Sequence, residues 1–235
     1  MQDFNNKLNE KTQEIEDIIY SYLPNELNKQ KVIMEAMNYS VKAGGKRLRP
    51  MLMLETSKMF DKDCENIYPF MAAIEFIHTY SLVHDDLPAM DNDEYRRGRK
   101  TTHAEYGEDL GILAGDGLLN YAYEIMTKAV LESEDPYKAI QAMNVIATKA
   151  GIYGMVGGQT VDVISEGKKI DLDTIMYIHN LKTAALTEAS MMAGAILAGA
   201  TQTQIDTVEN IANNVGIAFQ IQDDILDIIS TTEKL

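Results

Sequence analysis

The amino-acid sequence predicts an all-α protein, a single-domain large helical bundle, from three observations. Apolar residues recur at three- and four-residue spacing, as in Ile67, Phe70, Ile74 and Ile77, which is the period of one face of a helix. Alternating apolar and polar runs bounded by turn residues, which indicate β-strands, are scarce. Fourteen Met and no Trp among 235 residues favour a helical interior over an aromatic-rich β-sandwich.

Helix-breaking residues divide the periodic pattern into the expected elements. In chain order, the first expected helix spans 2–22 and ends before Pro24-Asn25, and the second spans 26–43 and ends before Gly44-Gly45. The third spans 50–60 and ends before Asp61-Lys62-Asp63, and the fourth spans 65–87 and ends before Pro88. After Gly98, the fifth expected helix spans 107–132 and ends before Asp135-Pro136, and the sixth spans 136–165 and ends before Gly167. The seventh begins at Asp171 and spans 171–199, and the last spans 204–229. The chain has no Ser/Gly/Pro-rich linker and no internal repeat, so residues 1–235 are expected to form one domain.

The composition argues against nucleic-acid and membrane partners. The formal net charge is −15, whereas binding to nucleic acid depends on Lys and Arg that neutralise phosphates. The most membrane-like stretch, residues 184–200, contains Glu188 and falls short of the roughly 18 uninterrupted apolar residues of a membrane span. It is predicted to be a buried helix that packs closely through small side chains, so neither nucleic acid nor a membrane span is expected.

The single cysteine bears on the compartment. Cys64 has no second cysteine to pair with inside the chain, as is usual in a reducing cytoplasm. The first residues also lack the basic segment followed by an apolar segment that marks a signal peptide. We therefore expect a cytoplasmic protein.

Two aspartate clusters stand out on an otherwise apolar background. Asp85 and Asp86 lie on the last turn of the helix at 65–87, where negative charge opposes the helix dipole, and Pro88 then turns the chain so that Asp91 returns toward them. This placement indicates a cation as their partner, although an ordinary acidic loop has the same composition.

The second cluster lies on the last expected helix. Gln220, Asp223, Asp224 and Asp227 fall within an arc of about 100° on this helix. No Lys or Arg stands one turn away to relieve the repulsion between the carboxylates. Magnesium usually binds through one or two carboxylates together with substrate phosphates, so the two clusters face to face predict a Mg²⁺-bridged diphosphate site.

Three sets of basic residues complete this prediction. Lys46, Arg47 and Arg49 follow Gly44-Gly45 and precede a helix that Pro50 helps to start; Arg96-Arg97 follow the first acidic cluster; and Lys182-Thr183 lie among small residues. Cations beside a helix N-terminus favour an anion, and Arg suits bidentate recognition of phosphate. Each set alone is typical of a protein surface, but together they predict two diphosphates, one held by metals and one by side-chain cations.

The motifs resemble those of the trans-prenyltransferases, the trans-isoprenyl diphosphate synthase family, and within it the bacterial farnesyl diphosphate synthases. The matching segments are GGKRLRP (44–50), HTYSLVHDDLPAMDNDEYRRG (78–98), GGQTVD (157–162), LKT (181–183) and FQIQDDILD (219–227). The resemblance implies the isoprenoid synthase fold, a helical bundle around a central cavity, and usually a homodimer. It also implies Mg²⁺-dependent condensation of isopentenyl diphosphate with dimethylallyl or geranyl diphosphate to give farnesyl diphosphate.

The resemblance also implies roles for individual residues. The expected metal ligands are Asp85, Asp86 and Asp91 of the first motif and Asp223, Asp224 and Asp227 of the second, with Asp85, Asp91 and Asp223 as the direct ones. The expected contacts to the allylic diphosphate are Arg96, Lys182, Thr183 and Gln220, and those to isopentenyl diphosphate are Lys46, Arg49, His78 and Arg97. The catalytic set is Asp85, Asp86, Asp91, Lys182 and Asp223.

Tyr80 is the residue expected to set product length. It lies five residues before Asp85, roughly 7 to 8 Å along the helix, although the two side chains differ in azimuth by about 140°. In the resembling family a bulky aromatic residue at this position forms the floor of the cavity and limits the product to fifteen carbons. A tyrosine that only fills the core fits the same sequence.

Other interpretations stay open. The family normally continues past the second motif with a Gly-Lys segment and further helices, whereas this sequence reaches Leu235, so we expect a chain without the family's C-terminal segment. A geranylgeranyl diphosphate synthase and a non-catalytic partner subunit are therefore alternatives. The third is a metal phosphohydrolase that uses the pair His84-Asp85 with His78, His103 and His179, but it leaves Arg96-Arg97 and the second aspartate cluster unexplained.

Overall fold

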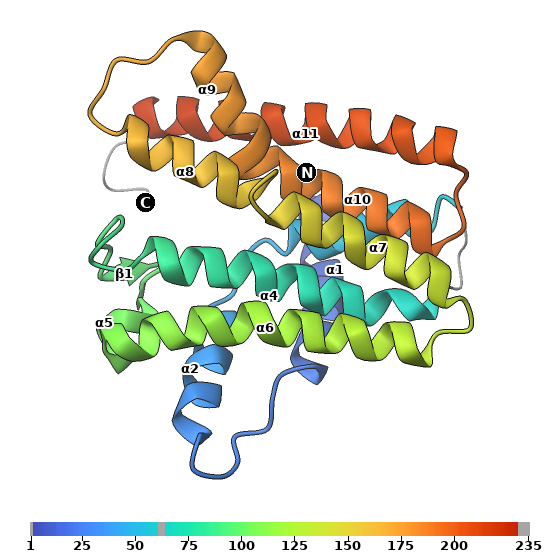
Figure 1. The fold of residues 1–235 in the computed structure, drawn as a ribbon, viewed down its shortest axis with the longest axis horizontal. Helices are drawn as coiled ribbons and strands as arrows, with labels where there is room; N and C mark the ends of the chain where they lie inside the picture. Colours follow the sequence, from blue (N-terminus) through green and yellow to red (C-terminus); the bar gives the residue numbers. More distant parts are fainter. Residues whose placement is uncertain (1, 61–63, 230–235) are drawn as a thin grey trace.

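The computed structural model describes residues 2–60 and 64–229, and the described chain is an all-α bundle, as predicted (Figure 1). Its helices are α1 (Gln2–Ser21), α2 (Lys31–Val41), α3 (Leu48–Ser57), α4 (Tyr68–Asp85), α5 (Thr102–Tyr106), α6 (Glu108–Glu132), α7 (Pro136–Ala150), α8 (Met155–Ser165), α9 (Leu172–Ile178), α10 (Ala185–Leu197) and α11 (Gln202–Ile229). A short 3-10 helix, η1 (Glu65–Ile67), precedes α4, and a π-helix, η2 (His179–Ala184), lies between α9 and α10. The strands β1 (Tyr95–Arg96) and β2 (Arg99–Lys100) form one antiparallel hairpin.

Helix α4 is the centre of the bundle. It lies side by side with α6, and α1, α2 and α3 also pack on it (Figure 1). Phe70, Phe76 and Ile77 are fully buried, and most other residues of α4 are buried too. A helix that is apolar on all sides belongs in a protein core, so α4 is held firmly, and Asp85 at its end is placed with little freedom.

The segment 184–200 forms the buried helix that its small residues predict. Helix α10 packs against α3, α7 and α11, and nearly all its residues are buried. A β-carbon on Gly194 would overlap the backbone of Met53 in α3, so only glycine permits this approach. Among the described residues, no helix is long and apolar enough to cross a membrane.

The structure divides two helices that the sequence analysis predicts as continuous. The expected helix 136–165 breaks into α7 and α8 at Gly151–Gly154, where a β-carbon on Gly154 would overlap the carbonyl of Lys149. The expected helix 171–199 consists of α9, the π-helix η2 and α10. Between His179 and Ala184 the backbone hydrogen bonds join residues five apart instead of four. Helix α2 begins at Lys31 and α3 at Leu48, rather than at 26 and 50.

The sequence analysis also misses the hairpin. Its strands have two residues each, too short for an alternating pattern. The turn between them, Arg97-Gly98, has positive φ at both residues (54° and 73°), which is the two-residue turn that matches the twist of a hairpin. The hairpin directs the adjacent Arg96 and Arg97 to different partners.

Arg47 takes part in the fold rather than in an open anion site. Its guanidinium is buried and pairs with Glu75 on α4 at 2.7 Å and with Glu16 on α1 at 3.1 Å, and it donates to the carbonyl of Val41 at 2.7 Å. Arg47 therefore ties α1, α2 and α4 together at the start of α3.

We expect Glu75→Ala to lower the free energy of unfolding by about 3 to 5 kcal/mol, because it leaves the guanidinium of Arg47 buried without its closest counter-charge. Urea denaturation measures this loss. The matched control is Glu132→Ala in the exposed pair with Lys128, which costs at most about 0.5 kcal/mol. Equal losses in the two variants would contradict the structural role of Arg47.

Candidate active site

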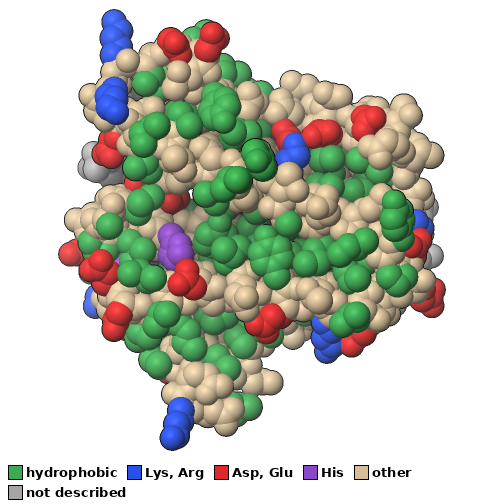
Figure 2. All heavy atoms as spheres, viewed as in Figure 1, with side chains coloured by type: hydrophobic (Ala, Val, Ile, Leu, Met, Phe, Trp, Pro, Cys, Tyr) green, Lys and Arg blue, Asp and Glu red, His purple; other side chains and the backbone are tan. Residues whose placement is uncertain are grey.

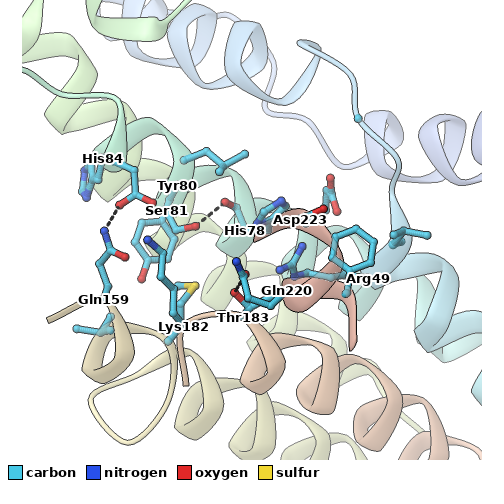
Figure 3. Close-up of a pocket in the computed structure, with 18 of the residues that line it drawn as sticks. Arg49, His78, Tyr80, Ser81, His84, Gln159, Lys182, Thr183, Gln220 and Asp223 are labelled. Atoms are coloured by element: carbon cyan, nitrogen blue, oxygen red, sulfur yellow. Dashed lines mark hydrogen bonds between the residues drawn. The ribbon is translucent and has the colours of Figure 1, made fainter. Parts of the chain in front are cut away.

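A large cavity of about 790 Å³ opens between the end of α4, the start of α3, α8, η2 and α11. Ten of the residues expected to bind metal or substrate, or to set product length, line it, although they come from distant parts of the chain (Figure 3). They are Lys46, Arg49, His78, Tyr80, Asp85, Arg97, Lys182, Thr183, Gln220 and Asp223. The fold therefore brings one member of each acidic cluster and all three basic sets around one space.

Several other expected site residues do not line this cavity. The residues missing from its lining are Asp86, Asp91, Arg96 and Asp224. The side chain of Asp227 lies outside the described residues.

Asp85 is a half-buried carboxylate with an incomplete counter-charge. Burial raises its pKa to about 6; the positive charge of Lys182 opposes this rise, and the negative charge of Asp91 adds to it. Its Oδ1 accepts a hydrogen bond from Nε2 of Gln159 at 2.8 Å (Figure 3). A bound cation would favour the charged carboxylate, so the surroundings of Asp85 fit a divalent metal.

Asp86 pairs with Arg96 rather than facing the cavity. Nε and one terminal nitrogen of Arg96 donate to Oδ1 of Asp86 at 2.8 and 2.7 Å, and the Asp86 side chain is almost fully buried. Burial raises the pKa of Asp86, and the guanidinium of Arg96 opposes this rise. The pair fastens the hairpin to the end of α4, next to Asp85.

The opposite side of the cavity is basic. Nε of Arg49 is buried and has no hydrogen-bond partner among the described residues, and burial lowers the pKa of Arg49. Burial together with the charges of Arg49 and Arg97 lowers the pKa of His78 well below its ordinary value, so His78 is neutral at physiological pH. Cations gathered at one end of a cavity favour an anion there, as the sequence predicts for this end.

The two glycines of the segment GGKRLRP both contact Arg97, and Gly45 makes room for it. Its guanidinium donates to the carbonyl of Gly44, and a β-carbon on Gly45 would come within 2.5 Å of a terminal nitrogen of Arg97. Gly44 and Gly45 both have positive φ, at 81° and 145°. Lys46, the next residue, lies 5.2 Å from the ring centre of Phe219, which also faces the cavity.

Helix α8 supplies two site residues that sequence reasoning did not assign, Gln159 and Asp162. Gln159 donates to Asp85, and the carboxylate of Asp162 pairs with Nζ of Lys182 at 2.6 Å. A β-carbon on Gly158 would overlap the backbone nitrogen of Lys182, so the glycine permits α8 to lie against η2. The segment GGQTVD was the signal for these roles, but residue spacing alone does not show what its Gln and Asp contact.

A hydrogen-bonded row joins η2 to α11. The hydroxyl of Thr183 donates to Oε1 of Gln220 at 2.7 Å (Figure 3), and Nε2 of Gln220 donates to Oδ1 of Asp224 at 2.8 Å. The other oxygen of Asp224 lies 3.2 Å from Nε2 of His179. Both carboxylate oxygens of Asp224 thus have protein partners.

One part of the cavity wall is apolar and includes Tyr80. The Tyr80 ring is buried, and it meets the ring of His84 edge-on with centroids 5.8 Å apart. Burial raises the pKa of Tyr80 to about 12. Met155 and Val163 of α8 also line the cavity, so its surface suits a hydrocarbon chain that extends from the charged end.

The histidines do not form the site that a metal phosphohydrolase needs. Nε2 of His84 hydrogen-bonds the carbonyl of Ile112 at 3.1 Å, and His103 contacts the hydroxyl of Thr101. In residues 2–60 and 64–229, no group of three or more His, Cys, Asp or Glu side chains is close enough to hold a metal ion without other ligands. His84 and His103, which the phosphohydrolase interpretation groups with Asp85, thus contact other parts of the fold.

Comparison with known proteins identifies the family. Residues 30–235 match the family described as polyprenyl synthetase. The chain belongs to the polyprenyl synthetase family. It is accordingly a trans-prenyltransferase of isoprenoid biosynthesis, from a family whose members generally depend on divalent metal, and the resemblance noted in the sequence is confirmed.

The similar proteins carry two product names. Farnesyl diphosphate synthase of Geobacillus stearothermophilus is 44% identical over 228 residues, which are 97% of this chain and 76% of that protein. Geranylgeranyl diphosphate synthase of Cyanophora paradoxa is 44% identical over 229 residues, which are 97% of this chain and 75% of that protein. The crystal structure of an FPP/GFPP synthase from Zymomonas mobilis matches with a TM-score of 0.88 at 36% identity, over 98% of this chain and 83% of that one.

Proposed function

We propose that the protein condenses isopentenyl diphosphate with dimethylallyl or geranyl diphosphate in the presence of Mg²⁺ and gives farnesyl diphosphate. The observation that carries this proposal is the lining of one cavity. Half-buried Asp85 and Asp223 stand on different helices, a basic group surrounds His78, and an apolar wall includes Tyr80. Two diphosphates and one hydrocarbon chain account for all three surfaces.

The proposed metal site lies between α4 and α11. Asp85 and Asp223 are the carboxylates that line the cavity, and we propose them as direct ligands, with Asp91 and Asp227 as further ligands. One or two carboxylates together with substrate phosphates are the usual ligands of Mg²⁺, so Asp85 and Asp223 would suit it. Asp86 and Asp224 have protein partners, so we propose that they support this site from behind.

A metal held by Asp85 and Asp223 would neutralise negative charge that develops on the allylic diphosphate as its carbon–oxygen bond breaks. Lys182 contributes to the same stabilisation from η2, and the hydroxyl of Thr183 and amide of Gln220 orient the diphosphate. The double bond of isopentenyl diphosphate then attacks the allylic cation, and the departed diphosphate takes the proton that is lost. No protein nucleophile is needed.

The basic side of the cavity is the proposed site of isopentenyl diphosphate. Arg49, Arg97 and Lys46 supply positive charge, and neutral His78 supplies a hydrogen bond. Because no metal ligand lies among these four residues, this diphosphate is held by side chains alone.

The adjacent Arg96 and Arg97 should act on different substrates. We expect Arg97→Ala to raise chiefly the KM for isopentenyl diphosphate, because Arg97 lines the basic side of the cavity. Arg96→Ala should raise chiefly the KM for the allylic substrate, because it leaves the buried carboxylate of Asp86 unpaired beside Asp85. Steady-state kinetics with each substrate varied in turn measures both effects; the same change for both substrates in both variants would count against this division.

We propose a homodimer on the basis of one exposed face. Hydrophobic side chains gather over α6 and its neighbours in Figure 2, and Ile112, Leu113, Leu131, Tyr137 and Ile140 of α6 and α7 are exposed large apolar residues. Exposed apolar patches of this kind mark protein interfaces. Sedimentation equilibrium tests the proposal, and a purely monomeric protein would refute it.

The activity is tested by incubation of the chain with Mg²⁺, isopentenyl diphosphate and geranyl diphosphate, followed by mass spectrometry. We expect farnesyl diphosphate and inorganic diphosphate. A product of twenty carbons would support the geranylgeranyl alternative, and a folded protein without product would support a non-catalytic partner subunit.

A further inference from the structure

We infer that His179 is a positioning residue that acts through Asp224 to hold the amide of Gln220 in the orientation that binds the allylic diphosphate. The inference rests on the proposed function, because it assigns a supporting role at the same site. It also assigns Asp224 to this support rather than to the metal.

The row of contacts has a defined direction. Nε2 of His179 lies 3.2 Å from Oδ2 of Asp224, and this contact is attractive when Nε2 carries a proton. Nδ1 of His179 is buried and has no partner among the described residues, so the ring has no competing hydrogen bond to turn it. Because His179 occupies one oxygen of Asp224, the other oxygen stays turned toward Gln220.

The orientation of Gln220 follows from its two partners. Its Oε1 accepts the Thr183 hydroxyl at 2.7 Å, and its Nε2 donates to Asp224 at 2.8 Å. A flip of the amide would set Oε1 against the acceptor-only carboxylate of Asp224, whereas the Thr183 hydroxyl could accept instead of donate, so Asp224 is the partner that fixes the orientation. A primary amide has two N–H groups. Asp224 takes one of them, and the second remains for a diphosphate oxygen in the cavity that Gln220 lines.

The π-helix explains why His179 and Thr183 serve one row. Both belong to η2. Helix α11 approaches η2 so closely that a β-carbon on Gly216 would come within 2.6 Å of Ala184, so glycine permits this approach. Single π-turns are frequent at functional sites. Here the turn places His179 against the back of the second aspartate motif, while Lys182 and Thr183 face the cavity.

Kinetic analysis of four proteins tests the inference: the wild type, His179→Leu, Gln220→Leu and the double variant. We expect His179→Leu to raise the KM for geranyl diphosphate about tenfold, the size of one lost hydrogen bond to a charged group, and to change that for isopentenyl diphosphate less than about twofold. In the Gln220→Leu background the same substitution should have no further effect. Independent, additive losses would overturn the inference, as would equal losses for both substrates.

His179→Gln is the conservative variant, because a glutamine amide offers a donor near the position of Nε2. It should restore most of the affinity for geranyl diphosphate, and a loss equal to that of His179→Leu would contradict a hydrogen-bonding role. Calorimetric titration with geranyl S-thiolodiphosphate gives a readout of binding that does not depend on turnover. A wild type that makes no product would refute the proposed function, whereas the titrations would still decide the role of His179.

Asp224→Asn provides a variant that does not alter the histidine. If Asp224 is a positioning residue, this variant weakens binding of geranyl S-thiolodiphosphate but leaves the Mg²⁺ concentration for half-maximal turnover unchanged. A shift in the Mg²⁺ requirement as large as that of Asp223→Asn would show that Asp224 binds metal, and would overturn the assignment.

Discussion

Asp85→Asn is expected to lower turnover about a thousandfold, because it removes a charged ligand from the metal that stabilises the departing diphosphate. Asp223→Asn should have a loss of similar size from the other side of the cavity. Far-UV circular dichroism should not change in either variant, since amide and carboxylate have the same shape. Steady-state turnover with saturating Mg²⁺ measures the losses.

The matched control is Asp173→Asn, at an exposed carboxylate in the first turn of α9, which should keep wild-type turnover. Removal of divalent metal with a chelator should abolish wild-type activity, and added Mg²⁺ should restore it. Equal wild-type activity with and without metal would refute the metal-bridged mechanism.

Tyr80→Ala is expected to change the product from fifteen carbons to twenty or more. The buried tyrosine lines the cavity on α4, and its replacement by alanine removes the aromatic ring from the apolar wall. A growing chain that meets this ring would then extend past it, and farnesyl diphosphate would become a substrate for another cycle. Mass spectrometry of the products formed from isopentenyl and geranyl diphosphate gives the distribution of lengths.

Ser81→Ala is the matched control, because Ser81 is adjacent, also lines the cavity and loses only a hydroxyl. It should leave the product at fifteen carbons. If Tyr80→Ala also stops at fifteen carbons, the residue that limits the chain is elsewhere, and Tyr80 only fills the core.

The spacing of apolar residues predicted the long helices well. Helices α4, α6 and α11 are present close to their expected bounds, because their apolar residues keep one period over several turns. The positions of Asp85 at the end of α4 and Asp223 on α11 follow from that period. That both line one cavity depends on tertiary packing, and the sequence indicated it only through the chemistry of a shared metal.

Residue spacing could not predict contacts that depend on local irregularities. The π-helix η2 and the hairpin at 95–100 have no periodic pattern, yet they place Lys182 and Arg97. Two further roles depend on pairing across the fold: Arg96 binds Asp86, and Arg47 joins Glu75 instead of facing an anion. In each case a basic residue that looked free in the sequence has a buried carboxylate as its partner.

The most direct test of the metal-bridged site is a crystal structure with Mn²⁺, which replaces Mg²⁺ and gives an anomalous signal, and geranyl S-thiolodiphosphate. The account predicts anomalous peaks between Asp85 and Asp223, each in contact with oxygens of the diphosphate, and Lys182 turned from Asp162 to the same diphosphate. A diphosphate bound beside Arg49 and His78, with no metal ion at Asp85 or Asp223, would contradict it.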